Sequence, residues 1–448
     1  MATRISRSRP WAVVALGGAA TLLAAACGSG SGSGSGNSAS APGITATTVT
    51  IGSTQPLTGP AALGYSEIAP ASKAYFQYVN AHGGVNGRSI NYIYLDDGYV
   101  PSNTPTQTRK LVLQDNVYAI FSALGTPTHL AVVNYLNSAK VPDVLVSSGC
   151  NCWNNVSQYP YTFGFQPDYT IEGKILGQYI KQTYPGMKVG YFAQGPNDEF
   201  GTDGIAGLND QLQGSGVTVL SPPQYYPPTA AGAAAVKSAI ATLQLQGAQV
   251  IAAFSVPLFT AIAEATAAAL NYHPIFVVSN VGSDPPTLTK ILTGGALGVT
   301  LPAALITGMV SDAYEPVVSD SSNPWVQLFK SIKNQYAPSL PWDGNVFYGM
   351  NQAYTFVQAL KAAGQNPSRD DLVHAIQNSH WRGPGLVPFG FSSSSHLGLL
   401  GVQIDKTNAD GSQTTMGPVY TTDDTSSGAI TQYTGTPATP PSNGIPSD

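Results

Sequence analysis

The sequence carries little charge. Of its 448 residues only 10% are Asp, Glu, Lys or Arg, whereas 43% are hydrophobic. Such a chain can bury a sizeable core, and uncharged polar residues and Gly must cover much of its surface. The formal net charge is −5 and no stretch forms a basic stripe. Nucleic acid is therefore not an expected partner.

Cysteine and histidine are also scarce. The 3 Cys and 6 His are mostly scattered, which leaves little material for a metal site, and we expect none. The enzyme motifs G-x-S-x-G, H-E-x-x-H, the P-loop and a G-x-G-x-x-G opening a helix are absent, so we expect neither catalysis nor a cofactor. A coiled coil is excluded because 34 Pro and 48 Gly punctuate the chain.

The first residues have the pattern of an export signal. Arg4, Arg7 and Arg9 precede an uncharged run that is short for a membrane span but typical of a signal peptide. Small residues stand directly before Cys27, as in a bacterial lipobox, although Ala24 replaces the usual Leu. We predict a signal peptide over 1–26 and a lipid on Cys27, which would hold the chain at the extracytoplasmic face of the cell membrane. An ordinary cleaved signal with an incidental Cys is the alternative.

Both ends of the mature chain have a biased composition. After Cys27, Gly and Ser alternate and small polar residues follow, so 27–47 is predicted to be a flexible linker. From Thr421 onward the sequence is dominated by Thr, Ser, Gly and Pro. We predict that 421–448 is a disordered tail.

Between these ends, strand and helix patterns alternate. The first series has strands at 48–53, 90–95, 118–122 and 144–147 with helices at 71–79, 107–113 and 130–139. The series restarts after Gln166-Pro167, with strands at 188–192, 217–220, 250–254 and 275–278 and helices at 171–179, 204–212, 233–245 and 259–270. Helices at 325–336 and 346–363 follow. The alternation implies parallel sheets, so we expect an α/β fold of two doubly wound lobes.

Three motifs then occur in a characteristic order. Gln55-Pro56-Leu57-Thr58-Gly59-Pro60 follows the first strand, and Asn80-Ala81-His82-Gly83-Gly84-Val85-Asn86-Gly87-Arg88 precedes the second, which ends at Asp96-Asp97. Gly195-Pro196-Asn197-Asp198-Glu199-Phe200-Gly201 follows a second-lobe strand. Together they resemble type I periplasmic substrate-binding proteins, and more narrowly the branched-chain amino acid (Leu/Ile/Val) binding family of ABC transporters, over roughly 48–419.

The resemblance implies a fold and a function. Two parallel-sheet lobes, 48–166 with 314–390 and 167–313 with 391–420, would be joined by a three-strand hinge, with its third crossing near Phe391-Ser394. A monomer would capture a small carboxylate-bearing ligand, either a branched-chain amino acid or a related organic or aromatic acid. It would deliver this ligand to an ABC permease and ATPase complex. A ligand-sensing receptor domain of the same fold is the alternative.

The resemblance also implies where the ligand's carboxylate is held. In the family, small hydroxyl residues and backbone N–H groups in loops after first-lobe strands hold it, an arrangement that favours anions. The first-lobe candidates are Thr58, Tyr65, Gly125, Thr126, Thr128, Ser147, Ser148, Gly149 and Cys150. Helix capping is the alternative role of Thr126 and Thr128. Cys150 and Cys152 form either a disulfide or two free thiols.

The second-lobe candidates are Tyr169, Phe200, Ser255 and Asn280. Asn280 and Val256 stand where amino-acid binders of the family carry an acid and a Tyr. A neutral Asn would leave an α-ammonium without its ionic partner, which is costly in a closed cleft. We therefore expect a ligand with a carboxylate but no ammonium that needs pairing, unless Asp284 supplies the charge.

Overall fold

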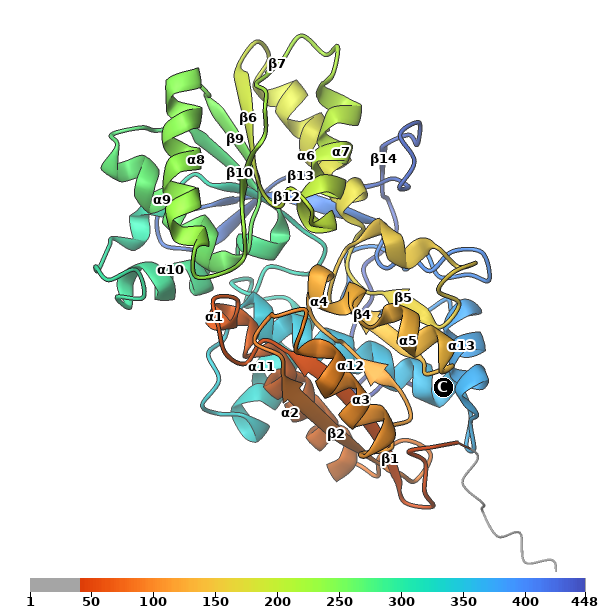
Figure 1. The fold of residues 1–448 in the computed structure, drawn as a ribbon. Helices are drawn as coiled ribbons and strands as arrows, with labels where there is room; N and C mark the ends of the chain where they lie inside the picture. Colours follow the sequence, from red (N-terminus) through yellow and green to blue (C-terminus); the bar gives the residue numbers. More distant parts are fainter. Residues whose placement is uncertain (1–40, 448) are drawn as a thin grey trace, which may run out of the picture. The chain divides into compact units, whose positions relative to one another are not determined.

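The computed structural model describes residues 41–447. The predicted signal peptide, Cys27 and most of the predicted linker lie outside these residues. The described chain forms two β-sheets, each with helices on both faces (Figure 1). The predicted α/β class with two doubly wound lobes is therefore confirmed. No helix within 41–447 has the length and apolar character needed to cross a bilayer.

The first sheet is parallel and has the order β2-β1-β3-β4-β5. Its strands are β1 (Thr48–Gln55), β2 (Ser89–Asp96), β3 (Ile120–Phe121), β4 (Asp143–Val146) and β5 (Thr162–Gly164). Its helices are α1 (Ala62–Tyr65), α2 (Ile68–Ala81), α3 (Thr104–Leu113), α4 (Thr126–Leu130), α5 (Val133–Ser138), α11 (Pro324–Tyr336), α12 (Gly344–Ala362) and α13 (Arg369–Gln377). A 3₁₀ turn, η1 (Asn151–Asn154), follows β4.

The two side chains of the short strand β3 pack on opposite faces of this sheet. Phe121 packs against Phe76 of α2 and Phe356 of α12, at ring centroid distances of 5.4 and 5.1 Å. Its neighbour Ile120 belongs to a separate core cluster with Leu111 of α3 and Leu136 of α5. A parallel strand covered on both faces needs such a continuous apolar run.

The second sheet continues in the order β14-β13-β12-β11-β10-β9-β6-β7, with β8 also paired to β6. Its strands are β6 (Lys188–Gln194), β7 (Thr218–Val219), β8 (Gln224–Tyr226), β9 (Val250–Phe254), β10 (Ile275–Val278), β11 (Val310–Ala313), β12 (Gly401–Thr407), β13 (Gln413–Thr421) and β14 (Thr431–Gln432). Figure 1 shows α8 (Gly232–Gln246) and α9 (Pro257–Ala269) on one face and α6 (Tyr169–Thr183) and α7 (Glu199–Leu212) on the other. The remaining elements are α10 (Pro285–Thr293), η2 (Asn280–Gly282) and η3 (Ala303–Ile306).

Several elements differ from the sequence prediction. The single helix expected at 130–139 is divided into α4 and α5, because Val132 has a φ of −129° and leaves the helical region. The antiparallel strands β12, β13 and β14, together with β8, α10 and α13, were not predicted. The predicted linker also ends earlier than expected, since Ile44 is buried and bridges to Val49 of β1.

The third crossing between the sheets lies later than predicted. The backbone of Gly164 in β5 donates to the carbonyl of His396, and Leu399 donates to the carbonyl of Phe165. Residues near 391–394 therefore still accompany the first sheet. The chain enters the second sheet only at β12, which pairs antiparallel with β11.

The C-terminal segment is not a disordered tail, contrary to the prediction. Its first part covers the second lobe, where the buried Lys174 ammonium donates to the carbonyls of Asp423 and Thr425 at 2.9 and 2.6 Å. After β14 the chain returns to the first lobe, and the Tyr75 hydroxyl of α2 donates to the carbonyl of Gly444 at 2.8 Å. Ile445 is only 7% exposed. This segment makes a fourth crossing between the lobes.

Candidate functional site

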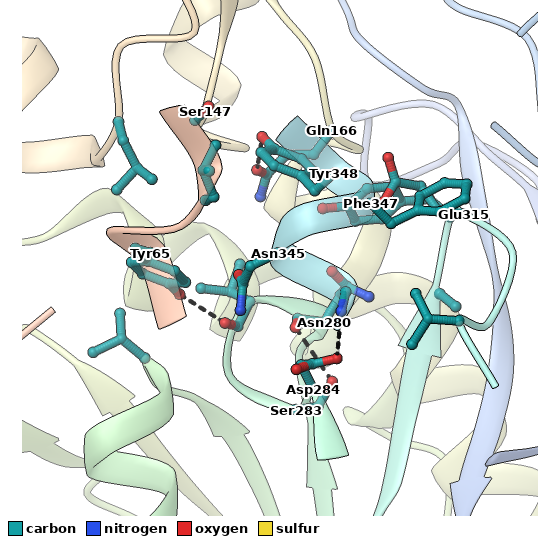
Figure 2. Close-up of a pocket in the computed structure, with 18 of the residues that line it drawn as sticks. Tyr65, Ser147, Gln166, Asn280, Ser283, Asp284, Glu315, Asn345, Phe347 and Tyr348 are labelled. Atoms are coloured by element: carbon teal, nitrogen blue, oxygen red, sulfur yellow. Dashed lines mark hydrogen bonds between the residues drawn. The ribbon is translucent and has the colours of Figure 1, made fainter. Parts of the chain in front are cut away.

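A large cavity lies between the two lobes, at the edge where parallel strands of both sheets end (Figure 2). Its empty volume is about 920 Å³, including its open mouth. Open α/β sheets bind ligands at the carboxyl ends of their strands. Aromatic side chains supply much of the wall: Tyr65, Tyr99, Tyr169, Phe200, Tyr314, Phe347 and Tyr348.

Six residues predicted from the sequence line this cavity, and they come from both lobes: Tyr65, Gly125, Ser147, Tyr169, Phe200 and Asn280. Gly125 has a φ of +106°, and a Cβ there would come within 2.5 Å of both Thr128 Oγ1 and the Tyr99 ring. Glycine is required at this position for both reasons.

Three other predicted residues use their hydroxyls away from the cavity. Thr58 donates to Asp96 Oδ2 at 2.6 Å. Thr128 donates to the carbonyls of its own helix start, at 2.7 Å from Leu124 O, so its role is local. Ser255 is fully buried and shares a hydrogen bond of 2.7 Å with Thr260. None of the three is among the lining residues.

Two hydroxyl groups that were expected to hold the ligand's carboxylate, those of Thr126 and Ser148, form a hydrogen bond with each other instead. Thr126 Oγ1 and Ser148 Oγ are 2.7 Å apart, and the Tyr169 hydroxyl lies 3.4 Å from Thr126 Oγ1. The Tyr169 ring approaches so closely that a Cβ on Gly149 would lie 2.9 Å from it. Thr126 and Ser148 therefore stand behind Tyr169, and it is Tyr169 that forms the cavity wall.

Cys150 and Cys152 are joined in a disulfide. Cys150 Sγ also accepts a hydrogen bond from the Cys152 backbone N–H and so begins the 3₁₀ turn η1. With Ser148 and Gly149, Cys150 borders a separate small hollow beside Trp153 rather than the main cavity.

Two acidic side chains line the main cavity: Asp284, which the sequence offered as a source of negative charge, and Glu315, which it did not identify. Asp284 begins α10, where its carboxylate accepts from Thr287 N at 3.0 Å and Thr287 Oγ1 at 2.5 Å. Glu315 follows β11, where the chain passes from the second lobe back to the first, which is its second crossing. Its carboxylate accepts from Asn351 Nδ2 at 2.6 Å. Burial raises the pKa of Glu315 to about 8. None of the described lining residues is Lys, Arg or His.

The prediction of a ligand without an ammonium group allowed one exception, a negative charge supplied by Asp284. That expectation rested on the neutral Asn280, whose amide donates to the Asp312 carbonyl at 2.9 Å. Although Asn280 lines the cavity, two carboxyl groups line it as well. An ammonium group would therefore meet acidic partners here.

Buried acids hold the loop that carries Asn280. Its backbone N–H lies 2.9 Å from both Glu172 Oε1 and Asp312 Oδ1. Burial raises the pKa of Glu172 to about 7 and that of Asp312 well above its usual range. Two facing carboxyls in a buried site cannot both ionise cheaply, so one retains its proton and the pair fixes the loop.

Direct contacts join the lobes on the side of the cavity where Tyr65 lies. The Tyr65 hydroxyl donates to the Val281 carbonyl at 2.6 Å, as the dashed line in Figure 2 shows. The Gly344 N–H at the start of α12 donates to Asp284 Oδ1 at 2.9 Å. Lys290 pairs with Glu67 at 2.7 Å. These bonds hold the lobes together over the cavity.

Among residues 41–447, no group of three or more His, Cys, Asp or Glu side chains is placed to hold a metal ion. The sequence of residues 48–412 matches the family model described as periplasmic binding protein. No curated protein matches the chain.

Solved structures share the fold at low sequence identity. A possible leucine/isoleucine/valine-binding protein from Rhodopirellula baltica SH 1 has a TM-score of 0.72 and 20% identity, covering 83% of this chain and 97% of that one. A branched-chain amino acid ABC transporter protein from Thermus thermophilus with bound valine has 0.69 and 18%, covering 84% and 97%. A solute binding protein from Rhodopseudomonas palustris BisB5 in complex with 3,4-dihydroxy benzoic acid has 0.66 and 18%, again covering 84% and 97%.

Proposed function

Because the chain belongs to the periplasmic binding protein family, we propose that it is the extracytoplasmic substrate-binding lipoprotein of an ABC importer. The observation that carries this proposal is the aromatic-walled cavity with lining residues from both lobes. A ligand there contacts both lobes and stabilises the closed state. The permease and ATPase would recognise that state, and this chain performs no chemistry itself.

The proposed ligand is a small organic molecule with a carboxylate group. Valine and 3,4-dihydroxybenzoic acid, the ligands named for two proteins of the same fold, both carry one. In this chain the Gln166 side chain lines the cavity and accepts from the Tyr348 hydroxyl through Oε1, at 3.1 Å. Its amide nitrogen is then oriented to donate to a ligand oxygen. For a ligand to reach the Thr126 and Ser148 hydroxyls, the Tyr169 ring that covers them would have to turn aside.

A thermal-shift screen of amino acids, aromatic acids and other small carboxylates tests this function. A ligand at about 100 times its Kd stabilises the folded state by about 2.7 kcal/mol, which is readily detected. We expect at least one class to raise the melting temperature. Turnover of a bound ester or amide would instead indicate an enzyme.

Replacing Thr126 with Ala tests the carboxylate site. We expect binding of a carboxylate ligand to weaken by about 1–2 kcal/mol, roughly 5–30-fold, because a hydrogen bond to a charged group is lost. Titration calorimetry measures the change. Thr128→Ala is the matched control, since its hydroxyl bonds only to backbone carbonyls, and it should lower stability without changing affinity. If Thr126→Ala behaves in the same way, Thr126 is only a link between loops.

The lipid anchor has its own test. The lipid anchor is proposed because small residues precede Cys27 and basic residues stand near the start of the chain. Cys27→Ser is expected to move the protein from the membrane fraction to the soluble fraction, because several acyl chains on one residue are what hold it. Detergent partitioning after cell fractionation measures this. Unchanged partitioning of the variant would refute the anchor.

A further inference from the structure

We infer that Glu315 is the residue that decides which ligand is accepted, and that it selects a protonated amine at the wall of the cavity near the hinge. This inference rests on the proposed function, because it concerns the same cavity. It assigns a role to a residue that the chain brings in at its second crossing, outside the loops that follow the first-lobe strands.

The first observation is the position of Glu315. Figure 2 shows it with Phe347 and Tyr348 on the side of the cavity away from Tyr65. One carboxyl oxygen accepts from Asn351 Nδ2 at 2.6 Å. The other has no hydrogen-bond partner in the part of the chain that the structure describes, and it is free for a ligand. Burial raises the pKa of this carboxyl, so it holds its proton for much of the time near neutral pH, and a bound cation would favour its ionised form.

A second observation points independently to a ligand at the same wall. Tyr314 lines the cavity and is only 4% exposed. Its hydroxyl makes no hydrogen bond with residues 41–447, and unlike the fully enclosed unpaired atoms of the core it is reached from the cavity. The Tyr314 ring lies 6.3 Å from the Tyr348 ring at an angle of 69°. An accessible hydroxyl and an accessible carboxyl oxygen therefore share this wall with aromatic rings, which suits a ligand group that donates hydrogen bonds.

The chemistry of this wall fits an ammonium group better than the alternatives. A protonated amine carries several donors that the free oxygen of Glu315 and the Tyr314 hydroxyl can accept, and the rings of Tyr348 and Phe347 attract its charge. A quaternary ammonium has no hydrogen to donate. A carboxylate at this wall would face Glu315 with no basic side chain among the described lining residues to offset the repulsion.

Two sets of matched probes test the inference by titration calorimetry. Leucine, 3-methylbutylamine and 4-methylpentanoate share one skeleton and carry both groups, only the amine, or only the carboxylate. Phenylalanine, phenethylamine and 3-phenylpropanoate form the aromatic set. We expect the amine-bearing members of at least one set to bind and the carboxylate-only member to bind at least about tenfold more weakly.

Two variants separate the ionic role from structural effects. Glu315→Gln should weaken the amine-bearing probes by about 10–100-fold and abolish the preference over the carboxylate-only member. Glu264→Gln is the matched control, because burial raises the pKa of Glu264 to about 8 as well, yet Glu264 does not line the cavity. It should leave the dissociation constants unchanged.

The outcomes distinguish this inference from the proposed function. Tight binding of a carboxylate-only probe, or equal amine binding by Glu315→Gln and the native chain, overturns the role of Glu315 while the binding function stands. Native mass spectrometry of the purified protein provides the second readout. A bound small molecule without an amine also overturns the inference. If no probe binds and no small molecule is found, the proposed binding function fails together with it.

Discussion

Removing residues 434–448 is expected to lower the free energy of unfolding by about 3–5 kcal/mol. Burial of one Ile side chain contributes about 2 kcal/mol, and each hydrogen bond to the segment adds about 1 kcal/mol. The lost bonds include Tyr78 Oη to Asn443 O at 2.7 Å and Trp325 Nε1 to Ala438 O at 2.8 Å. Ile445 would no longer cover its site in the first-lobe core.

Urea denaturation of the truncated and full chains measures this loss. Ile445→Asp is expected to reproduce most of it, because a carboxylate cannot occupy the apolar site without a large desolvation cost. Ser442→Asp is the control, since Ser442 is exposed in the same segment. An unfolding midpoint unaffected by truncation would show that the segment does not stabilise the first lobe.

The prediction of a disordered tail was wrong because average composition does not reveal the few residues that hold a segment against the rest of the chain. Residues after 421 are mostly Thr, Ser, Gly and Pro, which normally cannot bury enough apolar surface to fold. Here the rest of the chain supplies the surface, and a few contacts such as Ile445 and the acceptors for Tyr75 and Tyr78 suffice. The αβ repeat was predictable because each of its elements carries its own periodic pattern.

The candidate site was predictable in part for a similar reason. The family resemblance pointed to loops at the carboxyl ends of parallel strands, which share one edge of a sheet, and Tyr65, Ser147 and Asn280 do line the cavity there. It could not find Glu315 or Tyr348, because they come from the second crossing and from α12, far along the chain. One signal was available: Glu315 is an acid directly after the predicted lobe boundary at 313/314, which places a charge where the lobes meet.

For the Thr126 and Ser148 hydroxyls, the sequence predicted the loops that carry them but not their hydrogen-bond partners. Thr126 and Ser148 follow strands as expected, but the sequence could not reveal that they bond to each other at 2.7 Å with Tyr169 in front. Residue types and spacing give the loops, whereas the partner of each hydroxyl depends on side-chain packing between segments. For this reason the inference about the ligand is argued from Glu315 rather than from the Thr126 and Ser148 hydroxyls.

Glu264→Gln is expected to stabilise the protein strongly, and only above acidic pH. Glu264 lies on α9 and is 7% exposed, and burial raises its pKa from 4.5 to about 8. Below about pH 4.5 the carboxyl is neutral in both the folded and the unfolded chain, so it does not alter stability. As the pH rises, the unfolded chain loses this proton first, and stability falls by about 1.4 kcal/mol per pH unit until pH 8.

The amide of Gln cannot ionise, so Glu264→Gln removes this loss. The gain in unfolding free energy should be about 1 kcal/mol at pH 5 and about 4 kcal/mol at pH 8. Urea denaturation of both chains at the two pH values measures it, and the native chain at pH 5 serves as the internal reference. Equal gains at both pH values would mean that the buried charge is not their source. A loss at pH 5 would show that the protonated carboxyl makes a hydrogen bond that the amide cannot replace.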